Sequence, residues 1–161
     1  MATLILYATK YGASEKVAIQ LSRQLDDAPF YNLREKSLPL LSDFDTIIFG
    51  SSIYAGKIRK EAKAFLVKHQ AVLMDKKIGF FLSGLSQKEA EQCFKANIPM
   101  ELLQKAQIKA FLGGIFDPQK ANAAERTIMK LVAKQVLFTD TIEEEKIRDF
   151  AVQMRIQRNE R

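Results

Sequence analysis

The chain has 161 residues, of which 47% are hydrophobic and 27% charged, and its formal net charge is +6 at pH 7. No apolar run approaches the roughly 20 residues that cross a bilayer, the single Cys93 excludes an internal disulfide, and one Cys with one His excludes a structural zinc site. We therefore expect one domain over residues 1–161, with no metal, no secretory signal and a cytoplasmic location.

The N-terminal segment predicts a buried strand, a polar loop and a helix. Residues 4–7 form a continuous apolar run, which is typical of a strand buried on both faces of a parallel sheet. After the loop at 9–14, apolar side chains recur at helical spacing, and Ser14 stands at the predicted N-cap position. The side chains expected to face inward are Val17, Ala18, Leu21 and Leu25.

The middle of the chain predicts three more strands with a helix between two of them. Residues 30–33 and 45–50 give the second and third strands, and residues 78–82 give the fourth. A helix precedes the fourth strand. Its predicted inward residues are Ala62, Phe65, Leu66 and Leu73.

The C-terminal part predicts a fifth strand among helices. Helical material over 88–105 is expected to break at Ile98-Pro99, and residues 108–115 form a strand that Gly113-Gly114 weakens. Two helices follow, at about 121–136 and 143–156. Their predicted inward residues are Ala124, Ile128, Leu131 and Val132 in the first, and Ile147, Phe150, Ala151 and Met154 in the second.

This alternation of strands and helices predicts a three-layer α/β/α domain. Right-handed crossovers between successive strands give a parallel sheet covered on both faces, and five strands in this rhythm fit the doubly wound order 2-1-3-4-5. Ligands bind such a sheet outside the carboxyl ends of the strands, where the strand order reverses. The loops to consider are therefore residues 9–14, 51–56 and 83–86.

The first loop has the composition of a phosphate site. Its residues are Thr9, Lys10, Tyr11, Gly12, Ala13 and Ser14. Amides at the start of the helix favour an anion, and the hydroxyl groups add donors. The loop lacks both the Walker A ending and the dinucleotide fingerprint. A ligand with a single phosphate therefore fits the loop better than a nucleoside triphosphate or a dinucleotide. The alternative is an ordinary turn in which Ser14 only caps a helix.

The second loop adds an aromatic side chain among small residues. Ile53 and Tyr54 protrude between Ser51-Ser52 and Ala55-Gly56, which leaves room for a planar ring. In the alternative interpretation, Tyr54 packs on a neighbouring helix. Beside a phosphate loop, a mononucleotide is the economical explanation.

Both loops resemble those of the flavodoxin superfamily, which binds FMN. T-x-Y-G-x-S at 9–14 is similar to the family's phosphate loop, and G-S-S-I-Y-A-G at 50–56 to its first ring-binding loop. No long insertion splits the fifth strand, as in the short-chain form. The closest likeness within the superfamily is to the menaquinone-dependent protoporphyrinogen oxidases, although Tyr54-Ala55 stand where those enzymes usually carry Arg-Tyr.

The resemblance implies a distribution of roles around FMN. Residues 9–14 would hold the phosphate. Ser52, Ile53, Tyr54, Ala55 and Gly56 would contact the isoalloxazine and ribityl groups, and Ser83, Gly84, Leu85 and Ser86 the other side of the ring. The sequence places no side-chain acid or base for catalysis, so we name no catalytic residue beyond the flavin site.

Three functions remain open at this point. The first is an FMN oxidoreductase of the protoporphyrinogen-oxidase type that passes electrons from a reduced substrate to a quinone. The second is an electron carrier, and the third is a module that has lost FMN and binds a partner. The positive charge favours acidic partners, anionic substrates or peripheral contact with the inner face of an anionic membrane, and no motif indicates nucleic acid binding.

Overall fold

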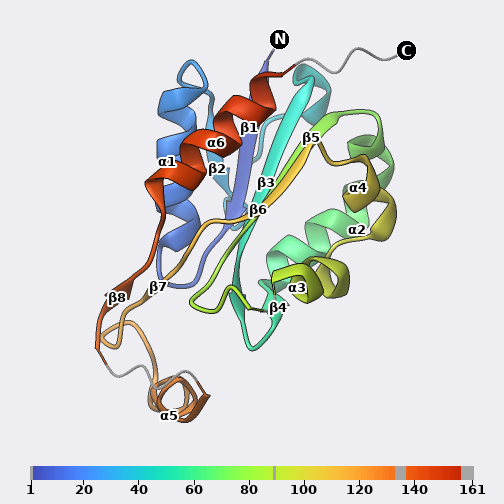
Figure 1. The fold of residues 1–161 in the computed structure, drawn as a ribbon. Coiled ribbons are helices and arrows are strands. Elements are labelled where there is room, and N and C mark those ends of the chain that lie inside the picture. Colours follow the sequence, from blue (N-terminus) through green and yellow to red (C-terminus); the bar gives the residue numbers. More distant parts are fainter. Residues whose placement is uncertain (1, 89, 133–136, 157–161) are drawn as a thin grey trace.

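Five parallel strands form the central sheet of the computed structural model, which describes residues 2–88, 90–132 and 137–156 (Figure 1). The strand order is β2-β1-β3-β5-β6, which confirms the predicted order 2-1-3-4-5. The strands are β1 (Thr3–Ala8), β2 (Phe30–Asn32), β3 (Thr46–Tyr54), β5 (Lys77–Ser83) and β6 (Ile108–Phe111).

Helices cover both faces of this sheet (Figure 1). One face carries α1 (Ala13–Gln24) and α6 (Glu144–Arg155). The other carries α2 (Lys60–Met74), α3 (Ala90–Asn97) and α4 (Met100–Lys105). The predicted break at Pro99 separates α3 from α4. A short 3-10 helix, η1 (Leu41–Asp43), precedes β3.

Two apolar cores fill the space between the layers, because successive strand residues point to opposite faces. In β1, Leu4 and Leu6 join the core beneath α2, whereas Ile5 and Tyr7 join the core beneath α1 and α6. The inward residues predicted for α1, α2 and α6 are all buried.

The fifth strand is shorter than predicted. It ends at Phe111 rather than Ile115, because the two glycines lead the chain out of the sheet. A Cβ on Gly113 would lie 2.1 Å from the Thr141 carbonyl oxygen, and one on Gly114 would lie 2.5 Å from the backbone of Gly84. This close backbone approach requires glycine at both positions.

The chain then forms an excursion beside the carboxyl edge of the sheet. It consists of β7 (Ile115–Phe116), α5 (Ala123–Val132) and β8 (Thr139–Asp140), with β7 and β8 paired antiparallel. Figure 1 shows α5 standing away from the three layers. None of the described helices is long and apolar enough to span a bilayer.

The orientation predicted for α5 is wrong. Ala124, Ile128 and Leu131 are exposed, because α5 lies beyond the sheet edge and no sheet face covers it. The side chain of Val132 and residues 133–136 of the predicted helix lie outside the described residues.

Candidate functional site

The first predicted loop connects β1 to α1 through a glycine turn. Gly12 is the N-cap of α1 and has φ 92°, a left-handed conformation that glycine adopts without strain. Its amide donates to Thr9 Oγ1 over 2.9 Å. The prediction that Ser14 is the N-cap is therefore wrong, since Ser14 is the second residue of the helix.

Ser14 instead connects the first loop to the third strand. Its buried hydroxyl lies 3.0 Å from Ser52 Oγ, which in turn donates to Thr9 Oγ1 over 3.4 Å. Near them, the first amides of α1 have no acceptor within the helix. Hydroxyls and free amides thus gather at one helix N-terminus, which suits an anion.

The second predicted loop is a tight hairpin. β3 does not end at Gly50 but continues to Tyr54 and pairs with β4 (Lys57–Ile58). Only Ala55 and Gly56 form the turn, with φ 51° and 76°. Positive φ at both central residues is typical of the type I′ turn, whose twist matches that of the flanking strands.

Asn97, at the end of α3, holds this hairpin from the side. Its Nδ2 donates to the Gly56 carbonyl over 2.9 Å, and its Oδ1 accepts from the Ile58 amide over 3.1 Å. The sequence analysis missed Asn97, because an asparagine two residues before Pro99 indicates only a helix end.

The third predicted loop lies against the second. The Gly84 amide donates to the Gly113 carbonyl over 2.9 Å. A Cβ on Gly84 would lie 3.6 Å from Ile53 Cβ. Leu85 packs on the cluster of Tyr11, Phe116 and Ala121. The structure therefore brings all three predicted loops together at one edge of the sheet, with Ala55, Gly56 and Ser86 exposed at the rim.

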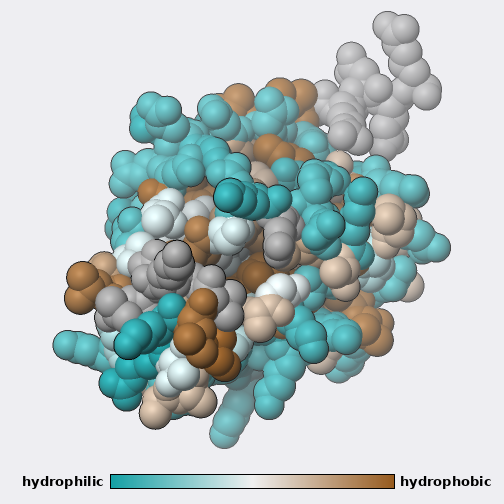
Figure 2. All heavy atoms as spheres, turned by 60° about the horizontal axis from the view of Figure 1, so that its bottom comes forward, coloured by the Kyte–Doolittle hydropathy of each residue, from teal (hydrophilic) through white to brown (hydrophobic). Residues whose placement is uncertain are grey.

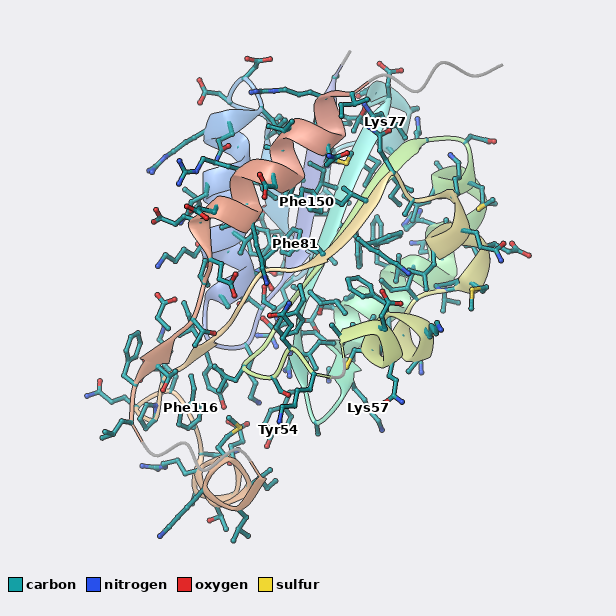
Figure 3. All side chains as sticks on the ribbon, viewed as in Figure 1. Tyr54, Lys57, Lys77, Phe81, Phe116 and Phe150 are labelled. Atoms are coloured by element: carbon teal, nitrogen blue, oxygen red, sulfur yellow. The ribbon has the colours of Figure 1, made fainter. Side chains whose placement is uncertain are left out.

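Two buried hydroxyls at this edge lack a hydrogen-bond partner within the described residues. They are Tyr54 Oη on the hairpin and Ser83 Oγ at the end of β5. Figure 3 shows Tyr54 at the carboxyl end of the sheet, opposite the end that carries Lys77. Leaving a buried polar group without a hydrogen bond lowers the stability of the fold by about 1–3 kcal/mol. A ligand with polar atoms at the edge of a ring would supply the missing hydrogen bonds.

Glu125 of the excursion reaches into the first loop. Its Oε1 lies 2.6 Å from Lys10 Nζ, and its Oε2 accepts from the Tyr11 hydroxyl over 3.0 Å. Lys10 Nζ also lies 4.4 Å from the centre of the Tyr54 ring. The sequence analysis missed Glu125, because it lies 115 residues from Lys10 and no local pattern joins them.

The ionisation of these groups follows from burial and from this contact. Burial raises the pKa of the Glu125 carboxyl, but hydrogen bonds from Lys10 and Tyr11 outweigh it and hold that pKa below its ordinary value. Burial, with the hydrogen bond to Glu125, raises the pKa of Tyr11. Burial also raises the pKa of Tyr54. Both phenols are thus protonated donors at neutral pH.

Comparison with known protein families identifies the family of this chain. The flavodoxin domain family matches residues 4–141, which include all three loops. The chain belongs to the flavodoxin domain family. Comparison with curated protein sequences gives no significant match.

Solved flavodoxins share the fold of this flavodoxin domain. Oxidised flavodoxin 2 from Bacillus cereus is 20% identical with a TM-score of 0.61, and the match covers 96% of this chain and 97% of that one. A short-chain flavodoxin associated with a non-canonical PDU bacterial microcompartment is 16% identical, with a TM-score of 0.60 and the same coverage. A Lactobacillus acidophilus flavoprotein in complex with FMN is 13% identical, with a TM-score of 0.50 and coverage of 70% and 91%.

The residues at the edge of this flavodoxin domain fit FMN. One helix N-terminus with clustered hydroxyls suits a phosphate, and within the described residues Tyr54 Oη and Ser83 Oγ have hydrogen-bonding capacity left for a polar ring. Family membership supports the same cofactor. The expectation of a flavodoxin-like FMN protein is thus supported, while the match does not single out the protoporphyrinogen oxidases.

Proposed function

We propose that this flavodoxin domain binds one FMN and passes electrons from a reduced substrate to a quinone-type acceptor. The observation that carries the proposal is that three loops meet at the edge of the sheet where two buried hydroxyls, Tyr54 Oη and Ser83 Oγ, have no partner among the described residues. When bound, FMN supplies the redox chemistry, and the protein binds and orients it.

The first loop would hold the phosphate. The amides of Ala13 and Ser14 and the Ser14 hydroxyl would donate hydrogen bonds to the phosphate. Thr9 would hold the turn by accepting from the Gly12 amide, and the positive φ of Gly12 allows that turn. Lys10 and Tyr11 hold the Glu125 carboxylate, so they would pair with the phosphate only on releasing that carboxylate.

The second and third loops would hold the ring and the ribityl chain. Ser52, Ile53, Tyr54, Ala55 and Gly56 would lie on one side, and Ser83, Gly84, Leu85 and Ser86 on the other. The Tyr54 hydroxyl can donate to an acceptor at the ring edge, because its raised pKa keeps it protonated. Asn97 would fix the hairpin, and therefore the place of Tyr54, through its hydrogen bonds to Gly56 and Ile58.

A quinone-linked oxidoreductase is the first candidate because of the resemblance to the protoporphyrinogen oxidases and because of the charge. A net charge of +6 steers anionic substrates, such as a tetrapyrrole with propionates, and anionic membrane surfaces toward the protein. Peripheral contact with the inner face of a membrane would bring the site to a lipid-soluble acceptor.

An electron carrier without its own substrate is the second candidate. It is favoured by the nearly full-length match to solved flavodoxins, which covers 96% of this chain. The flavin site is the same in both candidates, so they differ only in what reacts at its edge.

The test begins with an FMN titration followed by quenching of flavin fluorescence, with riboflavin as the control that lacks a phosphate. We expect FMN to bind much more tightly than riboflavin. If neither binds, the cofactor assignment is wrong.

Turnover then separates the two candidates. Trace amounts of the FMN-loaded protein are mixed with a porphyrinogen and a soluble quinone. Catalytic oxidation supports the enzyme, whereas stimulation only of a coupled reductase supports the carrier.

A further inference from the structure

Arg59 lies beside the predicted phosphate loop, although none of the three loops contains it. It follows β4 directly and is the N-cap of α2. Its amide donates to Ser51 Oγ over 3.1 Å, and Ser51 pairs with Ala8, the last residue of β1 before the first loop. The next residue of β3 is Ser52, whose hydroxyl lies 3.0 Å from Ser14 Oγ. The start of α2 therefore lies next to the hydroxyls at the start of α1.

Arg59 is a partly buried cation that has no anionic partner within the part of the chain that the structure describes. It forms no ion pair with any described residue, and its buried Nε has no hydrogen-bond partner among them. A cation taken out of water without a counter-ion lowers the stability of the fold. An anionic ligand would supply both the missing charge and the missing hydrogen bond.

The place of Arg59 in α2 adds to this cost. The N-terminus of a helix is the positive end of its dipole, where a further positive charge is unfavourable. Residues preferred at the N-cap accept a hydrogen bond from the first turn, whereas the side chain of Arg59 makes no capping hydrogen bond. Helix formation therefore does not explain an arginine at this position.

The charge of Arg59 reaches the first loop. Burial and the hydrogen bond to Glu125 raise the pKa of Tyr11, and the positive charge of Arg59 opposes that rise. Lys10, the basic residue of the same loop, is paired with Glu125. Arg59 is thus a cation beside the loop that no carboxylate of the described residues neutralises.

The neighbouring lysines differ from Arg59 in their exposure. Figure 2 turns the loop edge of the sheet forward and shows a surface that is mainly hydrophilic. Lys57 and Lys60 are exposed, so water and salt screen their charges. A guanidinium whose Nε is buried is screened less, and it attracts an anion at the same distance more strongly.

We propose that Arg59 binds the phosphate group of the ligand, which is FMN in the proposed function. The guanidinium would supply the positive charge, while the first amides of α1 and the Ser14 hydroxyl would supply neutral donors. A guanidinium can donate two parallel hydrogen bonds to one phosphate, which a lysine cannot match. The inference rests on the proposed function, because it names the residue that would recognise the phosphate of that cofactor.

Flavin titrations of Arg59→Gln test the pairing. We expect this variant to lose about tenfold or more in FMN affinity, with riboflavin affinity unchanged. Arg59→Lys keeps the charge without the planar fork and is expected to lose less than Arg59→Gln. The matched control is Lys60→Gln, which removes the same charge from an exposed neighbour. This control should bind both flavins as the wild type does.

Unfolding of the flavin-free protein separates ligand binding from a structural role of Arg59. Removing an unpaired cation should leave the urea midpoint of flavin-free Arg59→Gln equal to that of the wild type or above it. With excess FMN the wild type should have the higher midpoint, because it binds the ligand more tightly. A lower midpoint of Arg59→Gln without flavin would show that Arg59 supports the fold, and the proposal would be wrong.

Inorganic phosphate tests the same residue without a flavin. At an ionic strength held constant with sodium chloride, phosphate should raise the thermal midpoint of the wild type more than that of Arg59→Gln. An equal rise in both proteins would overturn the proposal.

The titrations can also overturn it. Arg59 does not bind the phosphate if Arg59→Gln loses affinity for FMN and riboflavin by the same factor, or if Lys60→Gln weakens FMN binding as much as Arg59→Gln does. If FMN binds tightly and Arg59→Gln binds it as the wild type does, this inference is wrong and the proposed function stands. If neither flavin binds but phosphate stabilises the wild type more than Arg59→Gln, the proposed function is wrong and the phosphate site at Arg59 is supported.

Discussion

Glu125 Oε1 lies 2.6 Å from Lys10 Nζ, although 115 positions separate the two residues in the chain. The contact joins the excursion to the loop that is predicted to bind phosphate. The loop therefore holds an internal carboxylate, and this carboxylate places a negative charge near the phosphate of an incoming FMN.

Replacing Glu125 by glutamine is expected to strengthen FMN binding. The substitution removes the negative charge and leaves Lys10 free to pair with the phosphate, so we expect affinity to rise about threefold to tenfold at low salt. Riboflavin affinity should not change. The control is Glu145→Gln on the exposed side of α6. Weaker FMN binding in Glu125→Gln would mean that the carboxylate supports the site instead.

Replacing Ser14 by alanine is expected to weaken FMN binding selectively. The substitution removes one donor from the helix N-terminus, so we expect about a tenfold loss for FMN and little change for riboflavin. The control is Ser22→Ala, which removes another buried hydroxyl of α1, bonded to the Ala28 carbonyl over 2.6 Å. That variant should lose stability without a difference between the two flavins. If Ser14→Ala weakens FMN binding and riboflavin binding equally, the phosphate does not bind at this loop.

The contact between Glu125 and Lys10 is expected to make stability depend on pH. Hydrogen bonds hold the pKa of Glu125 below its ordinary value of 4.5, so the stabilisation is present above that value and is lost as pH falls through the lower folded pKa. We expect the wild type to exceed Glu125→Gln by about 1–2 kcal/mol in free energy of unfolding at pH 7. Urea unfolding at neutral and acidic pH measures the difference. A difference that persists in acid would show that ionisation of Glu125 does not cause it.

The sequence could predict whatever depends on local periodicity. Continuous apolar runs identified the buried strands, and the spacing of Val17, Ala18 and Leu21 identified the inner face of α1. The same reasoning failed for Ile128 and Leu131, because periodicity locates an apolar face without showing what covers it.

The candidate site was predictable to the same extent. The three loops meet because parallel strands place their carboxyl ends at one edge. Glu125 and Asn97 were not predictable, since each reaches the site through contacts between distant parts of the chain. The end of β3 was misplaced because Ser51 and Ser52 resemble loop residues, although neighbouring strands bury them.

Replacing Asn97 by alanine is expected to affect both flavins equally, in contrast to Ser14→Ala. The amide of Ile58 would lose its acceptor and the Gly56 carbonyl its donor, so we expect a loss of about 1–3 kcal/mol in free energy of unfolding. The hairpin that carries Tyr54 would then be less fixed, and FMN and riboflavin affinities should fall by the same factor, because both ligands contain the ring. The control is Gln70→Ala on α2, which should change neither quantity. The side-chain amide of Gln70 donates one hydrogen bond to the exposed Glu101 over 3.3 Å. If Asn97→Ala loses stability while both affinities stay at the wild-type level, the hairpin does not contact the ring.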